Sequence, residues 1–189
     1  MLGESLSAVA FSPYGDVIEL PSSKGSSANQ GTAQRFNHLT KITSFSRPSK
    51  RDVSLNTCIF HAQPRMNQDL ASHEKPLFEI KLLERHKYST QLFLPYGTSS
   101  TASYLVIVCL NGKDDKPDLS TLKAFTATYS QGINYHPGIW HHPMVALNNP
   151  MTFFCQVHEN GVLEEDTEEI LLSPTLSVEI NHFLHLNQA

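Results

Sequence analysis

Short apolar runs, separated by glycine and proline, constrain the fold of this 189-residue chain more than any other feature. The clearest runs are "YGDVIEL" (14–20), "LNTCIFHAQP" (55–64), "TQLFLPYG" (90–97), "SYLVIVCLNG" (103–112) and "MTFFCQVHENG" (151–161). Each has the length of a strand, and convincing helical periods are few. We therefore predict one mainly β domain over 1–189, a sandwich or barrel with a few short helices.

Several other segments leave the local structure open. Residues 22–31 are rich in Ser and Gly and predict a polar loop, whereas 32–39 fits a strand or one helical turn. The periodicity of 77–86 is ambiguous. In 113–132 a loop leads into a helix or a strand, because "PDLS" favours a helix start and "FTATY" favours a strand. We expect 66–76 to be an exposed loop.

Charge and hydropathy exclude several classes of protein. The net charge is −4 with neutral histidines and there is no basic block, so nothing indicates nucleic-acid binding. The acidic stretch "LEEDTEEI" (163–170) is most simply a solvated surface segment. The longest apolar run, "YLVIVCL", is far too short to cross a bilayer, and no secretory or peroxisomal signal is visible. We predict a cytoplasmic protein that does not bind membranes.

The cysteines do not form a recognisable framework. Cys58, Cys109 and Cys155 lie far apart, each within an apolar run, and none belongs to a CxxC pair. An odd number at this spacing argues against disulfides and against a structural zinc site. We expect three buried free thiols.

The stretch "ERHKYSTQ" (84–91) can form one wall of a pocket. If the chain is extended here, Glu84 and His86 project to one face and Arg85 to the other, because side chains alternate along a strand. A bend after His86 would bring Gln91 toward the same wall. The alternative is an exposed turn that happens to carry polar residues, and spacing alone does not decide between the two.

The stretch "NYHPGIWHHPM" (134–144) can form a second wall. His141 and His142 are adjacent, so in an extended chain at most one of them lines a given pocket. Proline biases the preceding His136 toward extended backbone, and Gly138 permits a tight turn before Trp140. The alternative is a turn that carries core residues, and Trp140 alone is more often core than a ligand platform.

Together the two stretches have the spacing of the two cupin motifs. Glu84, His86 and Gln91, followed by Pro95 and Gly97, resemble the first motif, and "PGIWH" (137–141) resembles the second. The usual first histidine is replaced by Glu84 and the usual acidic ligand by Gln91, and an amide is a poor ligand beside a carboxylate. No cofactor is clearly required, although a divalent metal ion would use Glu84, His86, Gln91 and His141.

Longer stretches resemble one family, the ureidoglycolate lyases. They are "FSPYGDVIE" (11–19), "NQGTAQRF" (29–36), "ERHKYSTQLFLP" (84–95), "DDKPDLSTLKAF" (114–125) and "QGINYHPGIWHHPM" (131–144). The resemblance implies a cupin-type double-stranded β-helix barrel, related to jelly rolls. It also implies a homodimer that releases urea from ureidoglycolate and leaves glyoxylate, in allantoin and purine degradation. The likeness fades after about residue 150.

The residues fit that chemistry, which moves two protons and needs no covalent nucleophile. We expect His86 and His141 to act as base and acid, because imidazoles titrate near neutral pH. Glu84 would fix a histidine tautomer or bind an ion.

Four further residues are expected to bind the substrate. Arg35 would hold the carboxylate through two parallel hydrogen bonds, and Gln91 and Tyr135 would bind the ureido or hydroxyl group. Trp140 would close or support the pocket. Two alternatives remain at this point: another small-molecule cupin enzyme, such as an isomerase, and a non-catalytic ligand-binding cupin.

Overall fold

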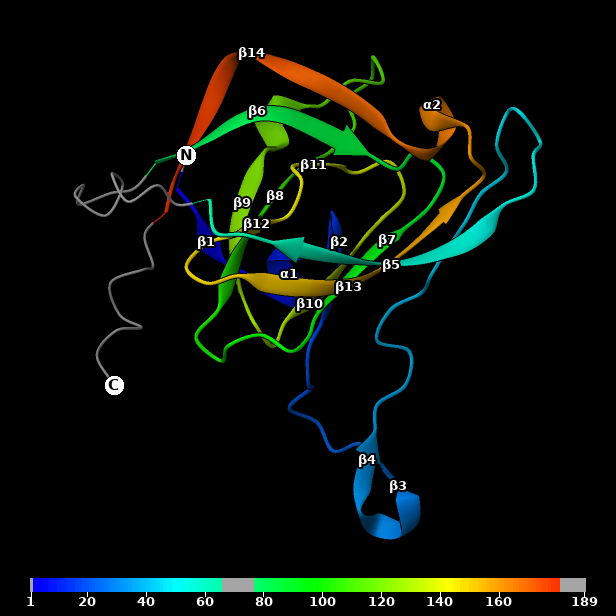
Figure 1. The fold of residues 1–189 in the computed structure, drawn as a ribbon, viewed down its shortest axis with the longest axis vertical. Helices are drawn as coiled ribbons and strands as arrows, with labels where there is room; N and C mark the ends of the chain where they lie inside the picture. The colour runs from blue at the N-terminus through cyan, green and yellow to red at the C-terminus, as the bar shows by residue number, and fades with distance from the viewer. Residues whose placement is uncertain (1, 66–76, 181–189) are drawn as a thin grey trace.

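Two β-sheets form most of the computed structural model, which describes residues 2–65 and 77–180 (Figure 1). The larger sheet runs in the order β1 (Glu4–Ser5), β9 (Lys123–Thr128), β8 (Ser103–Cys109), β11 (Trp140–His141), β6 (Leu77–Arg85) and β14 (Glu168–Glu179), and β12 (Val145–Ala146) also pairs with β8. The smaller sheet runs in the order β2 (Gly15–Ile18), β10 (Gly132–Tyr135), β7 (Gln91–Pro95), β13 (Met151–Glu159) and β5 (Ser54–Ala62). The prediction of a mainly β fold is confirmed, and the two sheets are consistent with a cupin-like barrel.

The alternation of side chains along β8 divides the apolar interior into two clusters. Tyr104, Val106 and Val108 join side chains of the smaller sheet in the first cluster, which therefore lies between the sheets. Leu105 and Ile107 face the other way and pack in a second cluster whose strand residues all belong to the larger sheet. Every residue of β8 is buried, so its apolar run reflects burial on both faces. The prediction of a buried strand at 103–112 is confirmed.

The ambiguous segments resolve mostly into strands. Residues 77–86 supply β6, and 32–39 supplies β4 (Ala33–Arg35). In 113–132 the helix start is only the 3₁₀ turn η3 (Leu119–Thr121), in which the Asp118 side chain accepts a hydrogen bond from the Ser120 backbone N–H, and β9 follows. Once that turn has ended, the β-branched and aromatic residues of 123–128 pair with β8.

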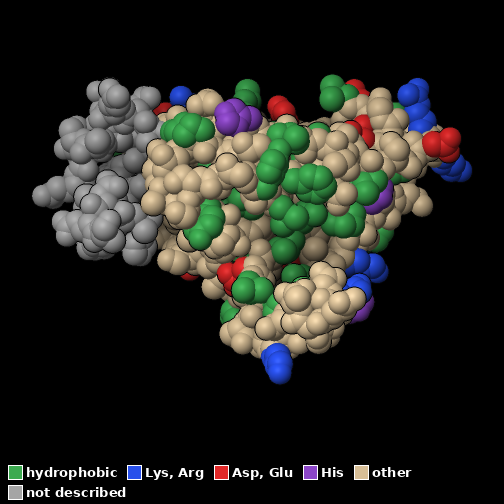
Figure 2. All heavy atoms as spheres, turned by 60° about the horizontal axis from the view of Figure 1, so that its bottom comes forward, with side chains coloured by type: hydrophobic (Ala, Val, Ile, Leu, Met, Phe, Trp, Pro, Cys, Tyr) green, Lys and Arg blue, Asp and Glu red, His purple; other side chains and the backbone are tan. Residues whose placement is uncertain are grey.

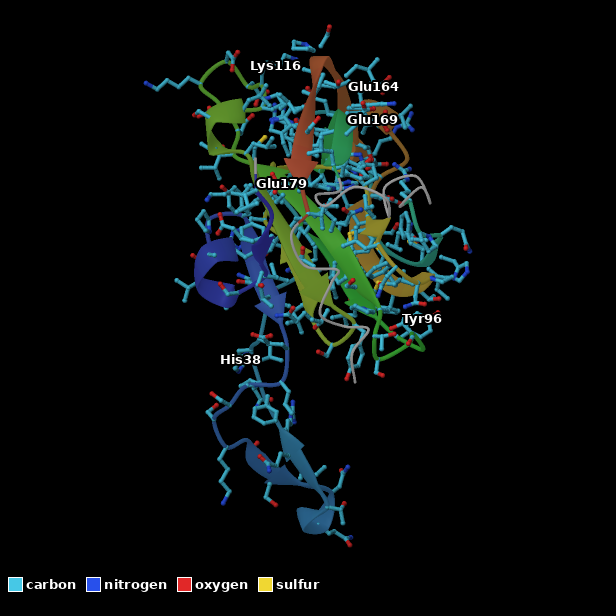
Figure 3. All side chains as sticks on the ribbon, turned by 90° about the vertical axis from the view of Figure 1, so that its left-hand side faces the viewer. His38, Tyr96, Lys116, Glu164, Glu169 and Glu179 are labelled. Carbon is cyan, nitrogen blue, oxygen red and sulfur yellow. The ribbon has the colours of Figure 1, made fainter. Side chains whose placement is uncertain are left out.

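Residues 22–31 are a correction, because they are only partly a loop. They contain β3 (Ser26–Ala28), which pairs with β4 around the 3₁₀ turn η1 (Asn29–Gly31). Gln30 within this turn has a φ of 58°, a conformation that a polar Gly-containing stretch tolerates. The resulting hairpin projects from the barrel (Figures 1 and 3).

Near the C-terminus, the acidic stretch forms the short helix α2 (Leu163–Asp166) and the start of β14. β14 is an edge strand whose register with β6 shifts between Leu171 and Leu176, around Pro174. One further short helix, α1 (Ala8–Phe11), is capped by the Ser7 side chain. The predicted loop at 66–76 lies outside the described residues.

The remaining global predictions concern thiols and membranes. Cys58, Cys109 and Cys155 are free as predicted, but only Cys109 and Cys155 are fully buried. Among the described helices, none has the length and apolar character needed to span a bilayer.

Candidate active site

The two predicted walls meet in the larger sheet. Strands β6 and β11 are hydrogen-bonded neighbours, and Glu84 and His141 lie directly opposite each other in their register. His86 follows the end of β6, and its ring stacks near that of His141 with 5.7 Å between centroids and an interplanar angle of 28°. The ligand atoms of Glu84, His86 and His141 all lie within 4.8 Å of one another. We call these three residues the His–Glu cluster.

The smaller sheet adds two predicted residues from the facing side. Gln91 begins β7 and Tyr135 ends β10, and the two are paired across the strands. The Gln91 Oε1 atom lies 3.1 Å from Nε2 of His141. The Tyr135 ring stacks on the His141 ring at 4.1 Å between centroids and an interplanar angle of 13°. Both sheets therefore contribute to one buried polar site beside the aromatic core.

Backbone carbonyls orient both imidazoles of the His–Glu cluster. Nδ1 of His141 donates to the Ile139 carbonyl at 2.9 Å, and Nδ1 of His86 donates to the Asp166 carbonyl at 2.7 Å. A carbonyl oxygen only accepts, so each Nδ1 carries a proton. The Nε2 lone pair of His86 then faces the cluster, whereas Nε2 of His141 faces the Gln91 and Glu84 oxygens at 3.1 and 3.6 Å. Nε2 of His86 is buried and has no hydrogen-bond partner in the part of the chain that the structure describes.

Burial and charge set the protonation of these groups. Burial, followed by the nearby His141, lowers the pKa of His86 to about 4, so the ring is neutral at neutral pH. Burial acts to raise the pKa of Glu84, but the hydrogen bond and charge of His141 outweigh it and the pKa is lowered. Burial raises the pKa of Tyr135 well above 10, so the phenol stays protonated. The site thus pairs a carboxylate with a neutral imidazole base and a phenol donor.

These donors fit a divalent metal ion. Two imidazole nitrogens and one carboxylate form a common ligand set for such ions, and carbonyl partners on the far ring nitrogens are typical of metal-bound histidines. The unpartnered Nε2 of His86 offers a ready ligand atom. The amide oxygen of Gln91 is a further oxygen donor close by, 3.1 Å from Nε2 of His141.

Two predicted residues are placed elsewhere. Arg35 is exposed at the end of β4, on the hairpin that projects away from the barrel (Figure 1). Trp140 is fully buried in the second apolar cluster and its Nε1 donates to Asn111 at 3.0 Å. Since Trp140 precedes His141 in β11, it faces the opposite side of the sheet. Its position supports the site from behind and does not line it.

The other two histidines of the second stretch also lie outside the cluster. His142 packs edge-on against Phe78 with 5.2 Å between ring centroids, on the side of the sheet that Trp140 occupies. This agrees with the prediction that at most one of His141 and His142 lines the pocket. His136 is partly exposed and its Nε2 lies 3.8 Å from Asp16.

The structure adds a buried ion network behind the cluster that the sequence did not reveal. Arg85 points away from Glu84 and His86, as predicted, and its side chain is 1% exposed. It donates to Asp115 at 2.9 and 3.0 Å and to Glu168 at 2.9 and 2.5 Å. Its guanidinium lies 4.3 Å from the Trp140 ring centroid and also donates to Asn111.

This network connects both walls. Arg85 lies between Glu84 and His86 along the chain, while Trp140 precedes His141. The sequence did contain a signal for the direction of the Arg85 side chain, because an arginine between two inward-facing strand residues must point to the opposite face. Its partner Asp115 lies in the "DDKPDLSTLKAF" stretch, but nothing in the sequence shows that the two meet.

Comparisons with known proteins show the family of the chain. The family model described as ureidoglycolate lyase matches residues 2–179. The chain is similar to the ureidoglycolate lyase of Schizosaccharomyces pombe, with 33% identity over 169 residues and 87% of each chain covered. It is also similar to the ureidoglycolate lyase of Escherichia coli O1:K1, with 38% identity over 165 residues that cover 87% of this chain and 91% of the relative. The chain belongs to the ureidoglycolate lyase family.

Proposed function

We propose that this protein cleaves ureidoglycolate to glyoxylate and urea, as a step of allantoin and purine breakdown. One observation carries the proposal: Glu84, His86 and His141 converge with Gln91 and Tyr135 in the interior of a chain of this family. An isomerase or a purely ligand-binding cupin is not favoured by the names of the relatives.

The reaction has a simple balance that suits the groups present. The central carbon of the substrate carries a hydroxyl, a carboxylate and a ureido nitrogen. Its C–N bond breaks as the hydroxyl oxygen forms a carbonyl, the hydroxyl proton leaves, and the departing nitrogen gains a proton. Neither water nor an oxidant is consumed. Two positioned proton carriers are therefore enough, each worth about 10²–10⁴-fold in rate.

The two histidines differ in a way that suggests their roles. His86 presents an unpartnered Nε2 lone pair and has a pKa of about 4, so it is free to accept the hydroxyl proton. Nε2 of His141 lies 3.6 Å from Glu84 and 3.1 Å from the Gln91 amide oxygen, so a proton on this nitrogen has two acceptors beside it. We assign His141 as the acid that protonates the leaving nitrogen. The negative charge of Glu84 then stabilises the positive charge that an imidazole ring carries during either proton transfer.

Tyr135 and Gln91 complete the polar lining. Among the described residues, the Tyr135 hydroxyl has only the Met144 sulfur as a partner, at 3.8 Å, and sulfur is a weak acceptor. A substrate oxygen would therefore be a better partner for this phenol. The Gln91 amide carries both donors and an acceptor, which match a ureido group.

A divalent ion is the alternative to these two proton-transfer roles, because a ring Nε2 that binds a metal cannot also accept or donate a proton. Glu84, His86 and His141 would hold it, with the Gln91 amide oxygen close by. When bound, such an ion would act as a Lewis acid that polarises substrate oxygens. Metal analysis of the purified protein, followed by complete chelation and re-addition of single metals, tests this alternative. Full activity in verified metal-free protein would remove an obligatory metal.

The activity itself is tested by incubating the purified protein with ureidoglycolate and measuring glyoxylate and urea. Equal amounts of both are expected. Ammonia in place of urea would show a hydrolase acting on the amide and would contradict the proposal. His141→Asn and His86→Asn should each lose at least about 10²-fold in kcat. His136→Asn is the matched control, because His136 lies outside the cluster.

A further inference from the structure

The described part of the site has no cation for the substrate carboxylate. Within residues 2–65 and 77–180, no lysine or arginine forms an ion pair or hydrogen bond with Glu84, His86 or His141. Arg85 is committed to acids on the other face of the sheet. Arg47 donates to the His158 carbonyl at 2.6 Å and lies 3.7 Å from Asp166, so its charge is paired although its Nε has no hydrogen-bond partner among the described residues. In the metal-free site, an anionic substrate beside the charged Glu84 therefore lacks a cation among the described residues that contact the cluster.

A small basic hairpin lies at the far end of the molecule. Residues 20–36 carry the hairpin of β3 and β4, which we call the arm, and contain Lys24 and Arg35 and no acidic residue. Within residues 2–65 and 77–180, the strands of the arm pair only with each other and not with either sheet. An isolated two-stranded hairpin is marginally stable in water, which indicates that the arm is covered in the working protein.

The surface of the arm has the features of a contact. The two ends of the arm, around residues 20–24 and 31–36, enclose a hollow of about 680 Å³. Its lining includes Leu20, Pro21 and Phe36. Leu20 is 80% exposed. Arg35 is also exposed and has no carboxylate partner among the described residues. The arm thus offers a partner both apolar side chains and the Arg35 guanidinium, which has no ion-pair partner among the described residues.

The complementary surface lies at the opposite end, next to the His–Glu cluster. Residues 163–170 contain five acidic residues and no basic one. Within them, the Asp166 carbonyl accepts the hydrogen bond from His86, so this acidic rim adjoins the cluster. Glu164 and Glu169 lie at the end of the molecule opposite the arm (Figure 3). One chain therefore cannot bring its own arm and its own acidic rim together in this conformation.

We propose that two copies of this chain pair with two-fold symmetry, and that the arm of each copy brings Arg35 to the His–Glu cluster of the other. The inference rests on the proposed function, because Arg35 would bind the substrate carboxylate through two parallel hydrogen bonds. In a two-fold dimer, the arm of each copy meets the acidic rim of the other copy, so the contact forms twice. This arrangement is possible because the arm and the rim lie at opposite ends of the molecule. Opposite charges on the two surfaces also steer the pairing.

An exposed apolar face next to the arm supports a second copy as the partner. Hydrophobic side chains gather on this face (Figure 2). The edge strand β5 of the smaller sheet leaves Ile59 63% exposed and Leu55 44% exposed, and Phe45 is 56% exposed. Contiguous apolar surface of this kind marks protein contacts. A dimer in which the arms cross would bury it.

A complementation experiment tests the exchange. Arg35→Met should lower kcat/KM at least about tenfold, mainly by raising KM, because charged hydrogen bonds to the carboxylate are lost. His141→Asn should be inactive. A mixed dimer of one Arg35→Met chain and one His141→Asn chain, purified through two different tags, should regain about half of the wild-type activity. One of its sites then has an intact His141 and receives an intact Arg35 from the other chain.

Three outcomes would overturn the exchange. They are an inactive mixed dimer, a fully active monomer in sedimentation at assay concentration, or an unimpaired Arg35→Met enzyme. A mixed dimer of Lys81→Met and His141→Asn is the control and should show half activity, because Lys81 is exposed on β6 and pairs only with Glu79. If the wild-type protein fails to release glyoxylate and urea, the proposed function fails instead. Sedimentation of wild type then still tests the dimer separately.

Discussion

Replacing Arg85 with methionine tests how the buried ion network supports the active site. The side chain of Arg85 is 1% exposed, while those of Asp115 and Glu168 are 50% and 34% exposed. Breaking a fully buried pair by removing one partner typically costs about 3–5 kcal/mol. Here the two carboxylates reach water after the change, so we expect the lower end, about 3 kcal/mol of unfolding free energy. Arg85→Lys keeps the charge but not the two-point contacts, so it should cost about 1–2 kcal/mol.

Urea unfolding, followed by circular dichroism, measures this cost against a control on the same strand. Lys81 of β6 is 67% exposed and pairs with Glu79 at 3.2 Å. Lys81→Met should therefore change the unfolding free energy by less than about 0.5 kcal/mol. Activity should fall in Arg85→Met at temperatures where the variant is still folded, because Glu84 and His86 flank this position. A loss below about 1 kcal/mol for Arg85→Met would refute the view that the network holds the two walls together.

Three further predictions concern single side chains. In metal-free protein, His86 should make stability depend on pH: its folded pKa of about 4 lies below the ordinary 6.5, so about 3 kcal/mol is lost as pH falls from 6.5 to 4. His86→Asn should flatten that part of the urea-unfolding profile, and parallel profiles for the two proteins would contradict it. Tyr135→Phe keeps the ring stacked on His141 but removes the phenol donor, so kcat/KM should fall about tenfold at unchanged stability, and unchanged kinetics would exclude a role for the hydroxyl. Gly15→Ala should destabilise by about 3 kcal/mol in thermal or urea unfolding, because its Cβ would overlap the Asn134 carbonyl of the paired strand β10, and a stable variant would contradict this close approach.

Much of the fold was predictable because the strand signals are local. Runs such as 103–112 are buried on both faces, and runs such as 151–161 alternate, so their patterns report their surroundings. The hairpin at 26–35 was missed because its residues are polar and pack against neither sheet. β14 was missed because Pro174 and the register shift interrupt its pattern.

The site shows the same division between local and distant information. Alternation along β6 was enough to place Glu84 and His86 together and Arg85 opposite them. It was not enough to find the partners of Arg85, because Asp115 and Glu168 are 30 and 83 residues away in the chain. The position of Arg35 also depends on how the arm leaves the barrel, which no local pattern encodes.

The pairing of Glu84 with His141 has a consequence for how the sequence can change in length. β11 has only two residues, Trp140 and His141, and they face opposite sides of the sheet. Inserting or deleting one residue in the preceding turn, 136–139, would present Trp140 to the cluster and turn His141 into the second apolar layer. Related genes should therefore keep this turn at constant length, even where they tolerate insertions in the arm.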